Sequence, residues 1–243
     1  MLTLLKKEIN VFLNSLIGYI AIIVFLLTIG LFMWVLPTES NVLDNGFANI
    51  DALFVISPWI FLFLIPAITM RTFADEKKGG TIELLLTRPL TDLQIILAKY
   101  LAGVLLVIIS LAPTLIYYYT VSILGSPPGN MDTGGMWGSY LGLLFLASAF
   151  VAIGVFASAI SNDQVTAFIL AMFLCFFCYT GFAFISTLDF FGRINNFILS
   201  LGINDHYLSM SRGVIDTRDV IYFFSLISIF IIATRTSLES RKW

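Results

Sequence analysis

The chain is poor in charge. Only 12% of its 243 residues are Asp, Glu, Lys or Arg, which is about half the share found in an ordinary globular protein. So little charge cannot cover the surface of a soluble domain of this length. The 59% hydrophobic content also excludes a disordered chain. The composition therefore indicates an integral membrane protein.

Other scarcities exclude further classes of protein. Two cysteines allow a single bridge, which excludes a secreted disulfide scaffold. A net charge of -2, with no long basic block, argues against a nucleic-acid partner. The single histidine cannot form an H-E-x-x-H metal site, and the sequence contains neither a phosphate-binding G-x-x-x-x-G-K-[ST] loop nor a G-x-S-x-G serine. We therefore expect no catalytic, cofactor or metal site on this chain.

Long apolar runs predict the architecture. A membrane-spanning helix needs about 20 mostly apolar residues, and continuous runs of this kind are unlike the alternating strands of a transmembrane barrel. The expected fold is all-α, one membrane domain over 1–243, with spans at about 16–36, 52–70, 101–124, 137–160, 165–188 and 220–236. The span cores contain no charged residue. Ion-coupled transport is therefore disfavoured, and energy for any transport has to come from another subunit.

The distribution of lysine and arginine predicts the orientation. Ten of the 13 lie at the amino end, in 71–99 or at the carboxyl end, whereas 37–51 and 125–136 have none. Basic residues accumulate on the cytoplasmic side of membrane proteins. Both termini and the segment 71–99 are therefore expected in the cytoplasm.

The amino end is amphipathic. Its apolar positions fall on one helical face, opposite Lys6, Lys7 and Asn10, and are Leu2, Leu5, Ile9, Phe12 and Leu13. This pattern suits a helix that lies in the membrane interface. Such a helix either anchors the first span or docks a partner.

The segment 71–99 holds nine of the 28 acidic and basic residues and an apolar run. Gly79 and Gly80 are expected to break the helix that leaves the second span. Thr81 can cap a short helix over 81–87, and Pro89 ends it. The pattern Thr91-x-x-Gln94 is a capping box for the next helix. A separate cytoplasmic helix between two spans suggests a docking surface, and the alternative is a plain surface hairpin.

Two further segments carry predictions. Ser161-x-x-Gln164 is a second capping box, with no function beyond starting the fifth span. The long segment 189–219 is expected to form an amphipathic helix in or on the outer leaflet, through apolar residues spaced as in a helix: Phe190, Phe191, Ile194, Phe197, Ile198 and Leu201. His206, beyond this helix, is interpreted as structural.

The stretch 71–89, RTFADEKKGGTIELLLTRP, resembles the loop between spans two and three of ABC-2-type transporter permeases. In that family an acidic residue, a Gly-Thr pair, a glutamate, two leucines and a later proline recur there. The amphipathic amino end, with Lys6, Lys7 and Glu8, is similar to the family's interfacial helix. The stretch 206–216, HYLSMSRGVID, resembles the family's approach to span six and contributes Arg212, Gly213 and Asp216. The compact chain looks most like the gliding-motility-associated permease subunits of Bacteroidetes.

The resemblance implies a mechanism. Two membrane halves, of the same chain or of a related one, would meet in the bacterial inner membrane above two cytosolic ATPase subunits, which bind ATP and Mg. An auxiliary membrane or periplasmic subunit is compatible with it. The helix 81–87 would couple the permease to an ATPase, using residues of the matching motif: Glu76, Gly80, Thr81, Glu83, Leu84, Leu85, Leu86, Arg88 and Pro89.

Two functions remain open at this point. One is a permease that exports a substrate with energy from a separate ATPase. The other is a membrane scaffold of an ATP-driven envelope machine that moves no cargo. Transport measured in reconstituted vesicles separates them, and a membrane enzyme is disfavoured for want of a catalytic set.

The orientation is testable by cysteine labelling. Asn45→Cys should react with an impermeant maleimide from outside the cell, because the loop 37–51 carries no lysine or arginine. Lys78→Cys should react only after permeabilisation. The reverse pattern would overturn the predicted orientation.

Overall fold

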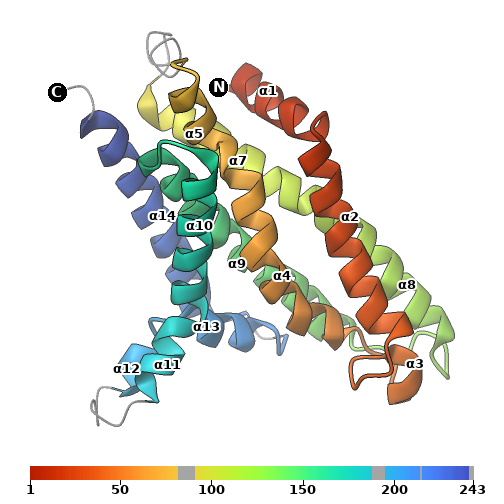
Figure 1. Cartoon of the computed structure of the whole chain (residues 1–243). Coiled ribbons are helices and arrows are strands. Elements are labelled where there is room, and N and C mark those ends of the chain that lie inside the picture. The colour runs from red at the N-terminus through yellow and green to blue at the C-terminus, as the bar shows by residue number, and fades with distance from the viewer. Residues whose placement is uncertain (82–90, 188–194, 214, 241–243) are drawn as a thin grey trace.

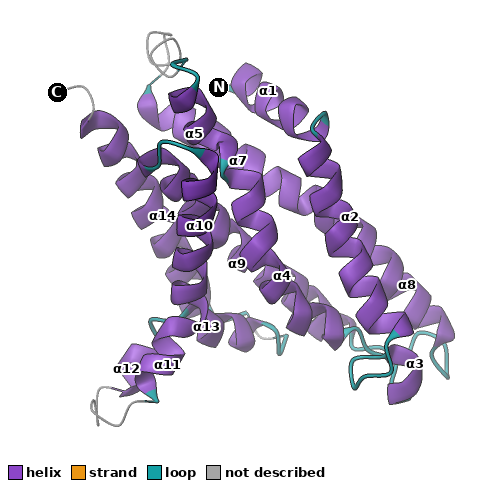
Figure 2. Ribbon diagram, in the orientation of Figure 1, coloured by secondary structure: helices purple, strands orange, loops and turns teal. Residues whose placement is uncertain are grey.

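The computed structural model describes residues 1–81, 91–187, 195–213 and 215–240. Within these ranges every regular element is a helix, as Figure 2 shows. Six helical rods are long and apolar enough to cross a membrane: Leu16–Val35, Asp51–Lys78, Asp92–Leu124, Thr133–Ile160, Gln164–Ser186 and Thr217–Glu239. The predicted all-α membrane protein with six spans is confirmed.

The rods run alternately up and down, so that both chain termini lie at one end of the bundle (Figure 1). This terminal end also carries α1 (Leu2–Leu13) and α5 (Arg71–Lys78). The opposite, far end carries α3 (Val42–Asn45), α11 (Phe182–Ser186), α12 (Asn195–Leu199) and α13 (Ile203–Met210). The arrangement agrees with the even number of spans.

The helix α9 (Thr133–Ile160) is the centre of the bundle. It packs against α4 (Asp51–Thr69), α7 (Asp92–Leu111), α10 (Gln164–Phe176) and α14 (Thr217–Glu239). In its most apolar 18-residue stretch 72% of the residues are buried, against 22% for the first rod, which begins with α2 (Leu16–Gly30), and 17% for α14. The glycine, alanine and serine residues of α9 explain its burial, because small side chains let neighbouring helix backbones approach closely. Such close packing holds membrane helices together, since lipid provides no hydrophobic driving force between them.

Some helices extend beyond the predicted membrane spans. The second rod continues past the span 52–70 through α5 to Lys78. The break at Gly79 and Gly80 is confirmed, since Gly79 caps α5 and Gly80 has a φ of 65°. The sixth helix is longer than expected, at 23 residues.

The start of the third rod and an interruption within it both have a cause in the local sequence. The predicted capping box is present: the Gln94 backbone N–H donates to Thr91 Oγ1 over 3.3 Å, and the Thr91 N–H donates to Gln94 Oε1 over 3.2 Å. A 3₁₀ turn, η2 (Ala112–Thr114), contains Pro113 and separates α7 from α8 (Leu115–Leu124). Proline lacks the N–H that a continuous α-helix needs, which accounts for the interruption.

The second capping-box prediction is wrong. Asp163, not Ser161, is the N-cap of α10, and its carboxylate accepts the Thr166 N–H over 3.0 Å. Ser161 instead donates its hydroxyl to the Ala157 carbonyl at the end of α9, over 2.8 Å. The Thr166 hydrogen bonds lower the pKa of the Asp163 carboxyl. A carboxylate in reach of free N–H groups outcompeted the hydroxyl.

The helix predicted in the long segment at the far end is covered only in part by the described residues. Residues 188–194 lie outside the described ranges, with Phe190, Phe191 and Ile194. The rest of the predicted stretch contains α12, and α13 follows beyond it. Phe197 is 64% exposed, whereas Tyr207 and Met210 of α13 are buried. The buried face of this segment is therefore supplied by α13, which packs on α9 and α14.

Gly213, one of the residues singled out by the family resemblance, lies against α9. Its φ is 82°, a left-handed conformation that favours glycine. A Cβ placed on Gly138 would lie 2.7 Å from the Gly213 Cα. Asp216, three residues later, caps α14 by accepting the Arg218 N–H over 3.0 Å. Both residues therefore determine how the chain enters the last span.

The Gly138 contact predicts a stability difference between two alanine variants. Gly138→Ala should lower the free energy of unfolding by about 1–3 kcal/mol, the usual cost of overpacking, because backbone atoms cannot rotate away. Gly134→Ala is the matched control, since its Cβ would meet nothing closer than Asp132 Oδ1 at 3.5 Å. Thermal unfolding in detergent measures both. Equal stability of the two variants would contradict the close approach.

Candidate functional site

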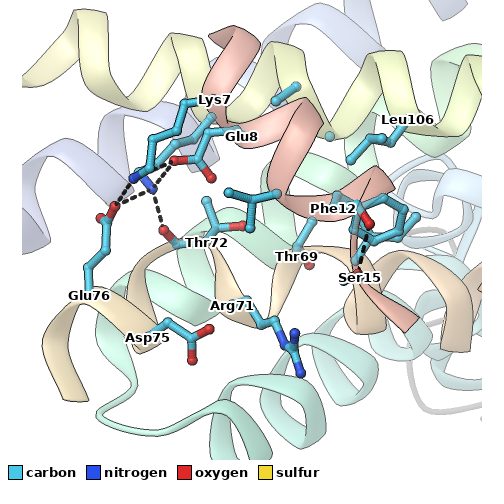
Figure 3. Close-up of a pocket in the computed structure, with 15 residues that line it drawn as sticks. Lys7, Glu8, Phe12, Ser15, Thr69, Arg71, Thr72, Asp75, Glu76 and Leu106 are labelled. Atoms are coloured by element: carbon cyan, nitrogen blue, oxygen red, sulfur yellow. Dashed lines mark hydrogen bonds and ion pairs between the residues drawn. The ribbon is translucent and has the colours of Figure 1, made fainter. Parts of the chain in front are cut away.

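A cluster of four charged side chains joins three helices at the terminal end. Lys7 and Glu8 come from α1, Glu76 from α5 and Lys99 from α7. We call these four residues the Lys99 cluster (Figure 3). Its two carboxylates face two ammonium groups, so that the formal charges balance.

Lys99 is the centre of the cluster. Its ammonium lies 3.0 Å from Glu8 Oε1 and 3.1 Å from Glu76 Oε1, and it donates to the Thr72 carbonyl over 2.6 Å (Figure 3). It also lies 5.0 Å from the centroid of the Phe73 ring, a cation–π distance. The Lys99 side chain is 1% exposed. All three donors of the buried ammonium therefore have acceptors, as burial of a charge requires.

The other members are less buried. The side chains of Glu8 and Glu76 are 18% and 14% exposed, and that of Lys7 is 56% exposed at 3.5 Å from Glu76 Oε1. The exposed Lys7 pair contributes little to stability. The pairs with Lys99 are different, because removing one partner of a buried pair leaves an uncompensated charge.

The Lys99 cluster borders a cavity of about 170 Å³ between α1, α5 and α7. Its apolar wall includes Phe12, Ile68 and Leu106. Figure 3 shows the side chains of Arg71 and Asp75 pointing away from the Glu76 carboxylate. Among the described residues, buried Glu76 Oε2 and Arg71 Nε have no hydrogen-bond partner. The cavity is thus lined by charged groups held in place by helices rather than by loops.

The opposite side of α5 is fastened to α9. The Ser158 hydroxyl accepts the N–H groups of Phe73 and Ala74, over 2.9 and 3.1 Å, and donates to the Met70 carbonyl over 3.0 Å. These bonds join the α4–α5 junction to the end of α9. Because Ser158 is fully buried, the hydrogen bonds are shielded from water.

Two side chains of α5 extend this attachment to the turn before α10. Lys77 donates to the carbonyls of Ala159 and Ser161, the latter over 3.0 Å. Gln164 donates to the Asp75 carboxylate. The helix α5 is therefore held on one side by α1 and α7 and on the other by α9 and α10.

The described ranges contain three of the nine expected coupling residues. Gly80 and Thr81 follow α5, and both are exposed. Glu76 lies on α5, and its carboxylate contacts Lys7 and Lys99 within the chain. The remaining predicted coupling residues lie outside the described ranges: Glu83, Leu84, Leu85, Leu86, Arg88 and Pro89.

The helix expected at the amino end is present as α1, and four of its expected apolar residues pack partly buried against the core: Leu5, Ile9, Phe12 and Leu13. Leu2, expected on its apolar face, is 79% exposed, and Leu4 is the buried residue. Glu8 points inward to Lys99, whereas Lys6 is exposed. The partner helix α7, on which α1 packs most extensively, decides which face is buried.

Sequence reasoning missed Lys99 and Ser158 as site residues. Lys99 carried a weak signal, since it is a lone charge where the third span begins, and such a charge needs a partner. Ser158 carried none, because a serine in a membrane helix usually bonds its own helix.

Comparison with known proteins gives the class. The family model of ABC-2 family transporter proteins matches residues 2–234. The chain belongs to this family, whose members are membrane permease components of ABC transporters and work with ABC ATPase subunits. No curated protein matches the chain. In the described residues, no group of three or more His, Cys, Asp or Glu side chains could hold a metal ion.

Lys99 should dominate the stability of this region. Lys99→Met is expected to lower the free energy of unfolding by about 3–5 kcal/mol, because it leaves the largely buried Glu8 and Glu76 carboxylates with only the exposed Lys7 as a partner. Adding Glu8→Gln and Glu76→Gln should recover most of this loss, since no buried charge remains. Denaturant unfolding of the purified protein measures both effects.

Lys6→Met is the matched control, because Lys6 is exposed on the same helix as Lys7. It should change the free energy of unfolding by less than about 0.5 kcal/mol. An equal effect of the Lys6 and Lys99 substitutions would show that the cluster is not a buried charge pair.

Proposed function

We propose that the chain is the permease half of an ATP-driven exporter that receives mechanical input from a separate ATPase at residues 79–91. The partner ATPase binds ATP and Mg and hydrolyses the ATP. The chain supplies the membrane path and the surface on which the ATPase acts. A second permease half, of the same chain or a related one, completes the membrane part.

The attachment of α5 carries this proposal. α5 is continuous with the second span and ends at Gly79, from which the segment toward the third span departs. A displacement of that segment acts on a helix hydrogen-bonded to α9 through Ser158 and ion-paired to α7 through Lys99. A push at one point is therefore passed to several spans at once, because packed interfaces move as units.

The chemistry of residues 82–90 supports a docking role. Leu84, Leu85 and Leu86 offer an apolar anchor between Glu83 and Arg88. Interfaces of this kind combine an apolar centre with a charged rim that selects the partner. Because Glu76 is occupied by Lys99, we assign the acidic part of the rim to Glu83 and give Glu76 the role of holding α5.

The cellular setting is part of the same proposal. The excess of lysine and arginine at the terminal end favours a cytoplasmic location of α1, α5 and both termini in a bacterial inner membrane. The sequence motifs at 71–89 and 206–216 favour a permease of the gliding-motility-associated type. An envelope machine that moves no cargo is the alternative that this type leaves open.

Copurification tests the coupling assignment. The variant with Glu83→Ala and Leu85→Asp should insert in the membrane but lose the ATPase when the tagged full-length chain is purified from native membranes. The readouts are Mg-dependent ATP hydrolysis in the eluate and mass spectrometry of a subunit with a phosphate-binding loop. We expect the ATPase to be lost because a charge placed in the apolar anchor of an interface removes most of the binding energy of that interface.

A matched variant controls for the change of charge. Leu43→Asp with Asp44→Ala also adds one carboxylate and removes one, on exposed residues of α3 at the far end. It should retain the ATPase at the wild-type yield. If the Glu83 and Leu85 variant also retains it at that yield, the segment 79–91 is not the docking surface.

A further inference from the structure

The far end contains a largely buried histidine–aspartate contact that the proposed function does not use. His206 of α13 lies with Nδ1 2.7 Å from Asp219 Oδ1 of α14, and its Nε2 lies 2.8 Å from the Ser200 carbonyl oxygen. The ring of Tyr222 stacks on the imidazole, with centroids 3.8 Å apart and planes inclined by 20°. We call Ser200, His206, Asp219 and Tyr222 the far-end latch.

The hydrogen bonds define how many protons the far-end latch needs. The Ser200 carbonyl can only accept, so His206 Nε2 must carry a hydrogen. A second proton must lie between Nδ1 and the Asp219 carboxylate. Without it, a ring lone pair faces a carboxylate lone pair at 2.7 Å. A neutral imidazole beside an ionised Asp219 therefore leaves one of the two contacts without a hydrogen, whichever tautomer it adopts.

The surroundings of Asp219 support the same conclusion. Asp219 is 5% exposed, and its Oδ2 has no hydrogen-bond partner in the part of the chain that the structure describes. A buried carboxylate with one unpaired oxygen needs an opposite charge close by, and the His206 imidazolium supplies it. The face of the Tyr222 ring, which carries partial negative charge, lies against the imidazole.

The other titratable groups near the latch do not replace this pair. On α14, Asp216 and Arg218 are exposed at the start of the helix, and on α13 Asp205 is exposed. Tyr207 of α13 donates its hydroxyl to the Phe54 carbonyl over 2.6 Å. α9 meets this part of α13 at Gly142. The element η3 (Phe177–Gly181), which also packs on α13, contributes Cys178 and Tyr179.

We propose that the far-end latch is a proton-dependent closure that holds α13 and the chain around Ser200 against the start of the last span. With the shared proton present, α12, α13 and α14 are tied together through one imidazole. When it is lost, one of the two bonds opens and the segment 195–210 loosens. Imidazole groups change charge between about pH 5 and 8, so the closure is tight in acid and relaxed in mild alkali.

The chain has one histidine, so a histidine-labelled sample reports on the latch alone. The full-length protein in phospholipid nanodiscs should show two protonated ring nitrogens at about pH 5.5 and one at about pH 8. Over the same interval, hydrogen exchange in 195–210, corrected for its intrinsic pH dependence, should accelerate by about tenfold. A tenfold change is expected when one hydrogen bond between charged groups is lost.

Three variants decide the outcome. His206→Asn keeps a donor for Asp219 and should give the same corrected exchange at both pH values. Asp219→Asn should also remove the pH response. Asp205→Asn, which removes an exposed carboxylate one residue from His206, should keep the wild-type response. The proposal is overturned if wild-type exchange does not change with pH, or if His206→Asn retains the response.

Discussion

The terminal end of the molecule depends on one constraint, the burial of the Lys99 ammonium at the edge of an apolar bundle. An ammonium that is 1% exposed is tolerated only when its donors are satisfied and its charge is balanced. Glu8 and Glu76 meet both needs. Because these glutamates lie on α1 and α5, both helices must pack close to Lys99 of α7.

This requirement explains why α5 is more than a linker. Ser158 and Lys77 fix its second side to the end of α9 and the turn beyond it, while the Lys99 cluster fixes the first. A short helix that is held on two sides has little freedom to move alone. Any partner that acts on the chain beyond Gly79 therefore acts on α1, α7 and α9 together, as a permease driven by a separate ATPase requires.

The two ends of the bundle use buried charge in different ways. At the terminal end, the Lys99 ammonium joins three helices through two carboxylates and a backbone carbonyl. At the far end, a histidine takes the same position between a carboxylate and a carbonyl. Since imidazole changes charge near neutral pH, the same geometry becomes a reversible contact there.

The sequence by itself determined the number of spans, their order and the breaks between them. Apolar runs of about 20 residues, Gly79 with Gly80, and the Thr91 capping box act locally, so their effects can be predicted without neighbours. The motif residues around 71–89 likewise indicated the family. The cap of α10 was missed because Ser161 and Asp163 compete over two residues, and only the actual backbone geometry selects the carboxylate.

Only the tertiary structure decided which charges meet. Glu8, Glu76 and Lys99 are separated by as much as 91 residues along the chain, and no local pattern connects them. The same holds for Ser158, which leaves the bonding pattern of its own helix to cap α5, and for His206, whose carboxylate partner is 13 residues away on another helix. Helix formation is a local property, whereas the partner of a buried charge depends on which helices pack side by side.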